Sequence, residues 1–159
     1  MKGRDEIEAT IPHREPFLFV DEVVEETEEA LVGRWTVPSD ADFFKGHYPG
    51  HPVTPGVILS EHCFQCAAIF IAGRMKAEQE DSGEEDQDSV PVLTRIEAAR
   101  FKRIVSPGET IESRVSVKER VGPAWYMSGS VTCGGKTVMM IRFVVSETGA
   151  LARLGAKLT

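Results

Sequence analysis

A long apolar stretch that begins at Val57 and contains one carboxylate, Glu61, constrains this chain more than any other feature. Pro55 and Gly56 precede it, and because proline suits the first turn of a helix, the sequence predicts a helix over about residues 55–75. Its residues are apolar nearly all the way round, which indicates a helix buried in the core. We therefore expect the rest of the chain to pack around this helix.

Glu61 and Gln65 are expected to share one face of the helix, because residues four apart lie above one another. A carboxylate among apolar side chains loses hydration, which favours its neutral form and raises its pKa. Glu61 could then donate a proton near neutral pH. The alternative interpretations are a Glu61 that is solvated at a helix end or paired with an arginine, and the spacing leaves them open.

The loop before the helix carries His47 in the string GHYPG, where glycine and proline restrict the backbone and hold the imidazole in one place. Imidazole is the side chain best matched to general-base chemistry near neutral pH. At the predicted helix start, the backbone N–H groups of Gly56 and Val57 lack helical partners and suit an oxygen that gains negative charge. A base, an acid and oxyanion donors are thus predicted within residues 43–72.

The string GHYPGHPVTPGVILSEHCFQ, residues 46–65, resembles the signature of the 3-hydroxyacyl-[acyl-carrier-protein] dehydratases of type II fatty acid synthesis, Z type. His47 and Glu61 have the spacing of that signature, and glutamate rather than aspartate favours the Z type over the A type. Residues 11–23 and 101–110 also resemble the family. Ile104 stands where the family commonly has proline, and Glu109 where it has aspartate.

This resemblance implies an α+β hotdog fold, a curved antiparallel sheet wrapped around the long helix, within one domain that spans residues 1–159. Its core is expected over about residues 11–147. Alternating apolar and polar residues predict two strands over residues 22–36, a strand over residues 90–103 and three more after Thr110. Residues 17–20 are strand-like, residues 133–136 predict a hairpin turn, and the tail from Thr148 is expected to fray.

The resemblance also implies roles for the site residues. His47 would remove a proton from the carbon next to a thioester carbonyl, the N–H groups of Gly56 and Val57 would hold the carbonyl oxygen, and neutral Glu61 would protonate the departing 3-hydroxyl. Gln65 would orient Glu61 or the water. Two aromatic residues are expected to line the way into the site: Phe43 and Phe44.

In the family, the histidine and the glutamate reach one site from opposite subunits, which implies a homodimer, or a hexamer built as a trimer of dimers. The partner would be acyl carrier protein, and because its pantetheine arm is part of the substrate, no bound cofactor or metal is needed. Since that protein is acidic, a basic patch is expected to receive it. The candidates, which could equally be the solvated face of a strand, are Arg95, Arg100, Lys102 and Arg103.

Other polar residues are assigned structural roles. His13 and Arg14 match positions of the family pattern and are expected to anchor the start of the sheet. Cys63 and Cys66 lie in the buried helix without a second ligand pair at zinc spacing, so we expect them to fill the core. His62, in the same helix, is expected to face the sheet or a dimer partner.

Composition restricts the function further. The net charge is −7, but residues 78–88 hold seven acids and no base, which predicts a mobile acidic loop over about residues 77–89. No basic stripe with aromatic residues suggests nucleic acid. We expect no membrane span, no signal peptide and, with three cysteines, a cytoplasmic protein.

Three other functions stay open, while a hydratase of the related two-domain kind is disfavoured because its aspartate and histidine are close neighbours in sequence. A hotdog thioesterase would hydrolyse acyl thioesters without needing His47 and would release free thiol. A non-catalytic acyl-binding or scaffold subunit could keep the fold, although His47, Glu61 and Gln65 are all present. A dehydratase of a polyketide or other specialised lipid pathway would carry the same residues.

Overall fold

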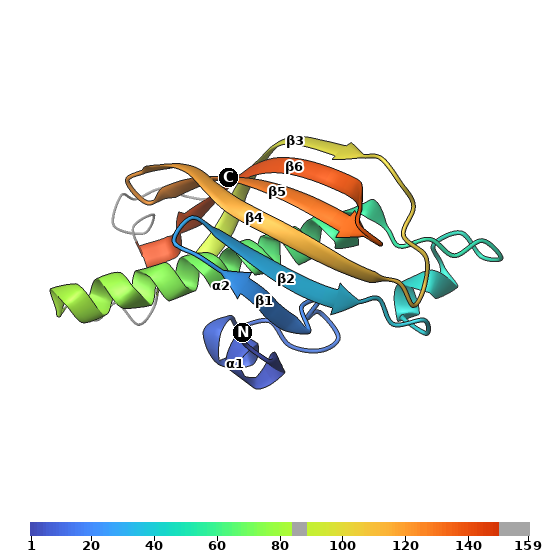
Figure 1. Ribbon diagram of the computed structural model, residues 1–159, viewed down its shortest axis with the longest axis horizontal. Helices are drawn as coiled ribbons and strands as arrows, with labels where there is room; N and C mark the ends of the chain where they lie inside the picture. The colour runs from blue at the N-terminus through green and yellow to red at the C-terminus, as the bar shows by residue number, and fades with distance from the viewer. Residues whose placement is uncertain (84–88, 150–159) are drawn as a thin grey trace.

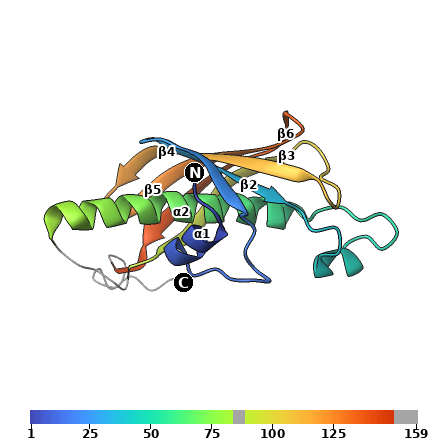
Figure 2. The ribbon, with the colours of Figure 1, turned by 60° about the horizontal axis from the view of Figure 1, so that its bottom comes forward.

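The computed structural model describes residues 1–83 and 89–149 of the chain. One curved six-stranded sheet wraps around the long helix α2 (Gly56–Ser82), and a short helix, α1 (Arg4–Thr10), lies beside the β1 edge of the sheet (Figures 1 and 2). This is the α+β hotdog fold that the sequence predicts.

The sheet has the order β1-β2-β4-β5-β6-β3, and every neighbouring pair is antiparallel. The α2 helix packs against one face, so apolar side chains that alternate along β4, β5 and β6 point toward it, whereas β3 at the edge is exposed over most of its length. The other face carries the polar residues of the same strands. The strands are β1 (Glu22–Glu26), β2 (Ala30–Thr36), β3 (Pro91–Phe101), β4 (Thr110–Val121), β5 (Ala124–Cys133) and β6 (Lys136–Glu147).

Two glycines allow α2 to lie close to the sheet. A Cβ atom at Gly33 of β2 would lie 2.5 Å from the Cys66 Sγ, and one at Gly129 of β5 would lie 3.0 Å from the Cys63 Sγ. Both thiols are buried and free. The prediction that these cysteines fill the core is therefore confirmed.

The α2 helix is longer than predicted, because it ends at Ser82 rather than near residue 75. Glutamate and glutamine are good helix formers, and Glu78 is paired with Arg120 of β4 at 2.5 Å. Gly83 then closes the helix in the left-handed conformation, with φ 71°. The prediction of a loop from residue 77 is therefore wrong for its first part, and residues 84–88 lie outside the described residues.

By length and composition, α2 is also apolar enough to cross a membrane, with a mean hydropathy of 1.4 over its most apolar window. The expectation of no membrane span relied on the absence of an apolar run long enough to cross, and α2 corrects that premise. In the described structure, 61% of that window is buried inside the protein. The observed environment of α2 is thus that of a core helix.

The strands predicted from alternation over residues 22–36, residues 90–103 and the region after Thr110 are present, as is the turn between β5 and β6. Residues 17–20 do not form the predicted strand, because the Phe19 N–H donates to the Gln65 side chain and not to a neighbouring strand. The α1 helix was not predicted. It has acids in its first turn and buries Ile7, while residues 150–159 of the predicted frayed tail lie outside the described residues.

The close packing of α2 on the sheet predicts the effect of Gly33→Ala. Because the new methyl group meets the Cys66 Sγ inside the core, we expect a loss of about 1–3 kcal/mol in the free energy of unfolding, measured by urea denaturation. Gly46→Ala, where no atom lies within 4 Å, is the control and should change stability little. Adding Cys66→Ala should recover part of the loss, and strictly additive effects would contradict the contact.

Candidate active site

Glu61 lies near the N-terminal end of α2, and its side chain is 21% exposed. It lines a cavity of about 300 Å³ between α2, the start of β3 and the N-terminal segment. Apart from Glu61 and His13, the cavity is apolar. Its lining residues are Pro12, His13, Glu61, Phe64, Ala68, Val90, Pro91, Val92, Leu93 and Val145.

The Gln65 amide holds one oxygen of this carboxyl group. Its Oε1 accepts the Phe19 N–H at 2.8 Å, and its Nε2 donates to the Phe17 carbonyl at 3.1 Å and to the Glu61 Oε1 at 3.0 Å. A backbone N–H can only donate and a carbonyl can only accept, so these bonds fix which end of the amide faces Glu61. Among the described residues, the Glu61 Oε2 has no hydrogen-bond partner.

The environment raises the pKa of Glu61. Burial in the cavity is the main cause, and the hydrogen bond from Gln65 and the attraction to His13 act in the opposite direction. Within the part of the chain that the structure describes, no arginine pairs with Glu61, and the side chain is mostly buried. Neither alternative interpretation, a solvated glutamate or an arginine pair, describes its position.

His13 is the site residue whose position the sequence did not predict. Its Nε2 lies 3.6 Å from the Glu61 Oε1, and its Nδ1 is buried without a hydrogen-bond partner among the described residues. A role only in anchoring the start of the sheet does not account for this position inside the cavity. The available signal was the match of the string PHR to the family pattern, which carries no information on spatial proximity to Glu61.

His47 lies on the loop after the short 3₁₀ helix η1 (Asp42–Lys45), and its tautomer follows from one contact. Its Nδ1 is 2.8 Å from the Val53 carbonyl oxygen. Because a carbonyl oxygen only accepts, the Nδ1 of the neutral ring carries the hydrogen, and the Nε2 keeps a lone pair. The Tyr48 ring packs against the imidazole with 4.6 Å between centroids. This geometry leaves the Nε2 able to accept a proton.

The start of α2 leaves two backbone donors free. The N–H groups of Ile58 and Leu59 both donate to the Pro55 carbonyl, at 3.0 and 3.2 Å. Within residues 1–83 and 89–149, the N–H groups of Gly56 and Val57 have no hydrogen-bond acceptor. The Phe101 ring lies so close to Gly56 that a Cβ there would be 2.8 Å from it, which supports a need for glycine at this position.

A single chain does not bring His47 and Glu61 together. The loop that carries His47 extends past the N-terminal end of α2, away from the body of the protein (Figures 1 and 2). Among the described residues, His47 does not line the cavity that holds Glu61, nor does either phenylalanine of η1. Phe44 is buried in the core and Phe43 packs partly buried beside it, with 4.6 Å between the ring centroids.

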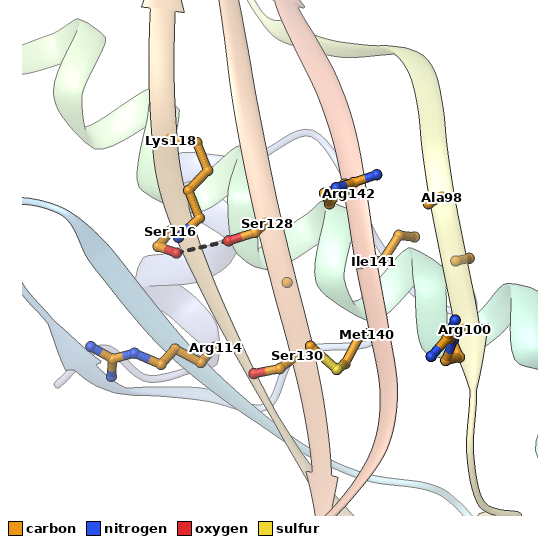
Figure 3. Close-up of a pocket in the computed structure, with 12 residues that line it drawn as sticks. Ala98, Arg100, Arg114, Ser116, Lys118, Ser128, Ser130, Met140, Ile141 and Arg142 are labelled. Atoms are coloured by element: carbon orange, nitrogen blue, oxygen red, sulfur yellow. Dashed lines mark hydrogen bonds between the residues drawn. The ribbon is translucent and has the colours of Figure 1, made fainter.

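The predicted basic patch is divided. Arg95 pairs with Glu97 at 3.2 Å, and its guanidinium lies over the Tyr126 ring. Lys102 and Arg103 are exposed just after β3. Arg100 instead lines a hollow on the face of the sheet opposite α2, together with cations from other strands (Figure 3).

His62 faces the sheet, against Trp35 of β2, with 6.1 Å between ring centroids. Burial lowers the pKa of His62 to about 4, so this imidazole is neutral at physiological pH. The other histidine of the signature, His51, is exposed. Within the described ranges, no group of three or more histidine, cysteine, aspartate or glutamate side chains is placed to hold a metal ion.

Comparison with known proteins identifies the family of this chain and agrees with its fold. A family model described as "FabA-like domain" matches residues 11–142. The chain is 38% identical over 139 residues to the 3-hydroxyacyl-[acyl-carrier-protein] dehydratase FabZ of Anaeromyxobacter sp. (strain K), covering 87% of this chain and 85% of that protein. It is 35% identical over 136 residues to FabZ of Clostridium perfringens (strain SM101 / Type A), covering 86% and 91%.

Among solved structures, the dehydratase heterocomplex ApeI:P from Xenorhabdus doucetiae aligns with a TM-score of 0.73, covering 95% of this chain and 97% of that chain. The sequence identity is 16%. This likeness therefore shows the fold alone.

The raised pKa of Glu61 predicts that Glu61→Gln stabilises the protein at neutral pH. Above the ordinary pKa of glutamate, the wild type must either hold a charged carboxylate in an apolar cavity or keep the carboxyl group protonated. Both cost free energy of folding, and the neutral amide avoids this cost. Partial exposure limits the gain to on the order of 1 kcal/mol, or about 2–4 °C in Tm. Below about pH 4, the carboxyl group is neutral in both folded and unfolded states, so the difference should vanish. Thermal melts of the wild type and Glu61→Gln between pH 4 and pH 7 test this prediction. An unchanged or lower Tm of the variant at pH 7 would contradict it.

Proposed function

The chain belongs to the FabA-like family that includes the 3-hydroxyacyl-[acyl-carrier-protein] dehydratases, and we propose that it acts as such a hydro-lyase. It would convert 3-hydroxyacyl thioesters carried on acyl carrier protein to trans-2-enoyl thioesters, in fatty acid biosynthesis or a related lipid or polyketide pathway. The observation that carries the proposal is Glu61, a carboxyl group with a raised pKa and one free oxygen in an apolar cavity. Such a group is suited to donate a proton to a leaving hydroxyl.

The reaction needs a base, an acid and an oxyanion site. The Nε2 of His47 takes the proton from the carbon next to the thioester carbonyl, and the electron pair of that C–H bond forms the new double bond. The N–H groups of Gly56 and Val57 stabilise the charge on the carbonyl oxygen. Glu61 gives its proton to the 3-hydroxyl group, the C–O bond breaks, and water leaves. His47 then loses its extra proton and Glu61 regains one before the next turnover.

This chemistry requires two copies of the chain. Since His47 does not line the Glu61 cavity of its own chain, His47 of the partner subunit would reach that cavity in a homodimer, or in a hexamer built as a trimer of dimers. The apolar lining contributed by Phe64, Ala68 and Leu93 would hold the acyl chain. Phe43 and Phe44 would lie on the way into the site.

The carrier protein would dock through exposed cations near the end of β3. These are Arg95, Arg100, Lys102 and Arg103, of which Arg95 is already paired with Glu97. The pantetheine arm arrives with the substrate, so the reaction needs no bound cofactor or metal. We expect the protein to work in the cytoplasm.

The first test follows both products at once. Purified protein is incubated with a 3-hydroxyacyl-[acyl-carrier-protein], and enoyl thioester absorbance is recorded beside thiol release, for wild type, His47→Ala and Glu61→Gln. We expect enoyl product from the wild type and a loss of at least about 100-fold in kcat for each variant, because each removes one proton-transfer group. His51→Gln, at an exposed histidine of the same loop, is the matched control and should keep its activity.

Other outcomes would point elsewhere. Released thiol without enoyl product would indicate a thioesterase. Inactivity in both assays across several chain lengths, with the oligomer intact, would favour a non-catalytic acyl-binding subunit.

Mixing the His47→Ala and Glu61→Gln variants tests whether the two residues come from different subunits. Random subunit exchange in a dimer would then make one quarter of the sites complete and active. No activity would return if both residues came from one chain.

A second test concerns His13 as a positioning residue for Glu61. Attraction to His13 lowers the pKa of Glu61, so His13→Gln should raise that pKa further. Because the acid must be protonated, activity falls as pH rises through its pKa, and the alkaline limb of kcat/KM against pH should move to higher pH. His51→Gln should leave the limb in place. A lower rate with an unmoved limb would show that His13 acts only on the local structure.

A further inference from the structure

The face of the sheet opposite α2 carries a hollow of about 640 Å³, apart from the Glu61 cavity, and of its lining residues only Arg100 has a place in the proposed function. Figure 3 shows it over β3, β4, β5 and β6, with long basic side chains around three serines. Its size lies within the range of small-molecule sites. Its lining residues are Ala98, Ala99, Arg100, Arg114, Ser116, Lys118, Ser128, Gly129, Ser130, Met140, Ile141 and Arg142.

Strand register builds the hollow from two transverse rows of residues. In one row, Ser116, Ser128, Arg142 and Ala98 are successive cross-strand partners. In the other row, two positions along each strand, the partners are Arg114, Ser130, Met140 and Arg100. Residues two apart on a strand share a face, so both rows point away from α2.

Arg100 on the edge strand β3 and Arg142 on β6 are diagonal neighbours on adjacent strands. Diagonal neighbours are about 7–8 Å apart, so both guanidinium groups can reach adjacent phosphates of one ligand. Arginine binds phosphate oxygens in a bidentate manner, which suits this use.

Of the four cations that line the hollow, only Arg114 is paired with a carboxylate among the described residues. On the same face over β1 and β2, Arg34 pairs with Glu22 and Glu112, and Arg114 extends toward Glu25 at 2.9 Å. Among the described residues, Arg100, Arg142 and Lys118 have no carboxylate partner, and no carboxylate lines the hollow. Three uncompensated cations in a chain of net charge −7 favour an anionic ligand.

The serines add directed donors. The Ser116 and Ser128 hydroxyls are hydrogen-bonded to each other at 3.0 Å. In such a pair one hydroxyl donates and the other accepts, so the accepting hydroxyl keeps its own hydrogen for a ligand. Ser128 is the cross-strand partner of Arg142, which places this donor beside a guanidinium group.

We propose that the hollow binds an organic diphosphate, such as a nucleoside diphosphate. Its phosphates would lie between Arg100, Arg142 and Lys118, with the Ser116–Ser128 pair donating to them. Its apolar or planar part would lie on the side chain of Met140, which is 48% exposed, and on Ala98. A concave floor of alanine, glycine and serine between long cations fits a compact ligand better than the convex surface of a protein.

Calorimetric titration of the full-length protein with ADP, pyrophosphate, inorganic phosphate and adenosine tests this at about 0.15 M salt. We expect ADP to bind most tightly, pyrophosphate more weakly and inorganic phosphate weaker still, with no heat from adenosine. Arg142→Ala should weaken ADP binding at least tenfold, because it removes a charge-assisted contact, and Ser128→Ala by several-fold. Arg103→Ala, at an exposed arginine outside the hollow, is the matched control and should bind ADP like the wild type.

Each variant is first checked for the wild-type melting profile, and a second variant, Arg142→Gln, keeps more of the side chain if Arg142→Ala unfolds. Absence of ADP and pyrophosphate binding to the wild type would overturn the proposal. Equal binding to the wild type and to a folded Arg142 variant would also overturn it. Arg142 variants that bind ADP normally but dehydrate carrier-bound substrate with a raised KM would assign the surface to a protein partner instead. These binding results do not depend on the proposed dehydratase activity.

Discussion

The buried amide of Gln65 connects the parts of the chain on which the site depends. Its Oε1 accepts a hydrogen bond from the Phe19 N–H, and its Nε2 donates to the Phe17 carbonyl and to the Glu61 Oε1. The same residue therefore ties the N-terminal segment to α2 and directs one carboxyl oxygen. That segment brings His13 to within 3.6 Å of Glu61. The hydrogen bonds of Gln65 to the backbone of residues 17 and 19 therefore also help to complete the cavity.

The hotdog arrangement gives the two faces of one sheet different chemistry. Toward α2, Gly33 and Gly129 let the helix approach so closely that only small side chains such as Cys63 and Cys66 fit. Along the same helix, burial in the apolar cavity raises the pKa of Glu61. On the opposite face the same strands present arginine, lysine and serine to solvent, where charges keep their hydration. A proton donor is thus buried on one side and anion-binding groups are exposed on the other.

Much of the fold could be predicted from local patterns. The apolar run after Pro55 identified the central helix, and alternation identified the strands, because both signals depend on which faces are buried. The end of α2 was missed because an acidic composition suggested a loop, whereas Glu78 is stabilised by Arg120, which lies far along the chain. Residues 17–20 were assigned to a strand because they are apolar. Their composition does not show that the Phe19 N–H donates to the distant Gln65 side chain instead of to a neighbouring strand.

The candidate site shows the same limit more sharply. The apolar character of α2 around Glu61 could be predicted from the sequence, although most residues that line the Glu61 cavity come from the N-terminal segment, β3 and β6. The position of His13 depends on how residues 11–20 cross α2, and among the described residues His47 does not line the Glu61 cavity. The outer hollow depends on register: Arg100 and Arg142 are far apart in sequence but lie diagonally on adjacent strands. The sequence placed Arg100 in one group with Lys102 and Arg103. In the folded sheet, Arg100 instead lies on the same face as Arg142 and the serines of β4 and β5.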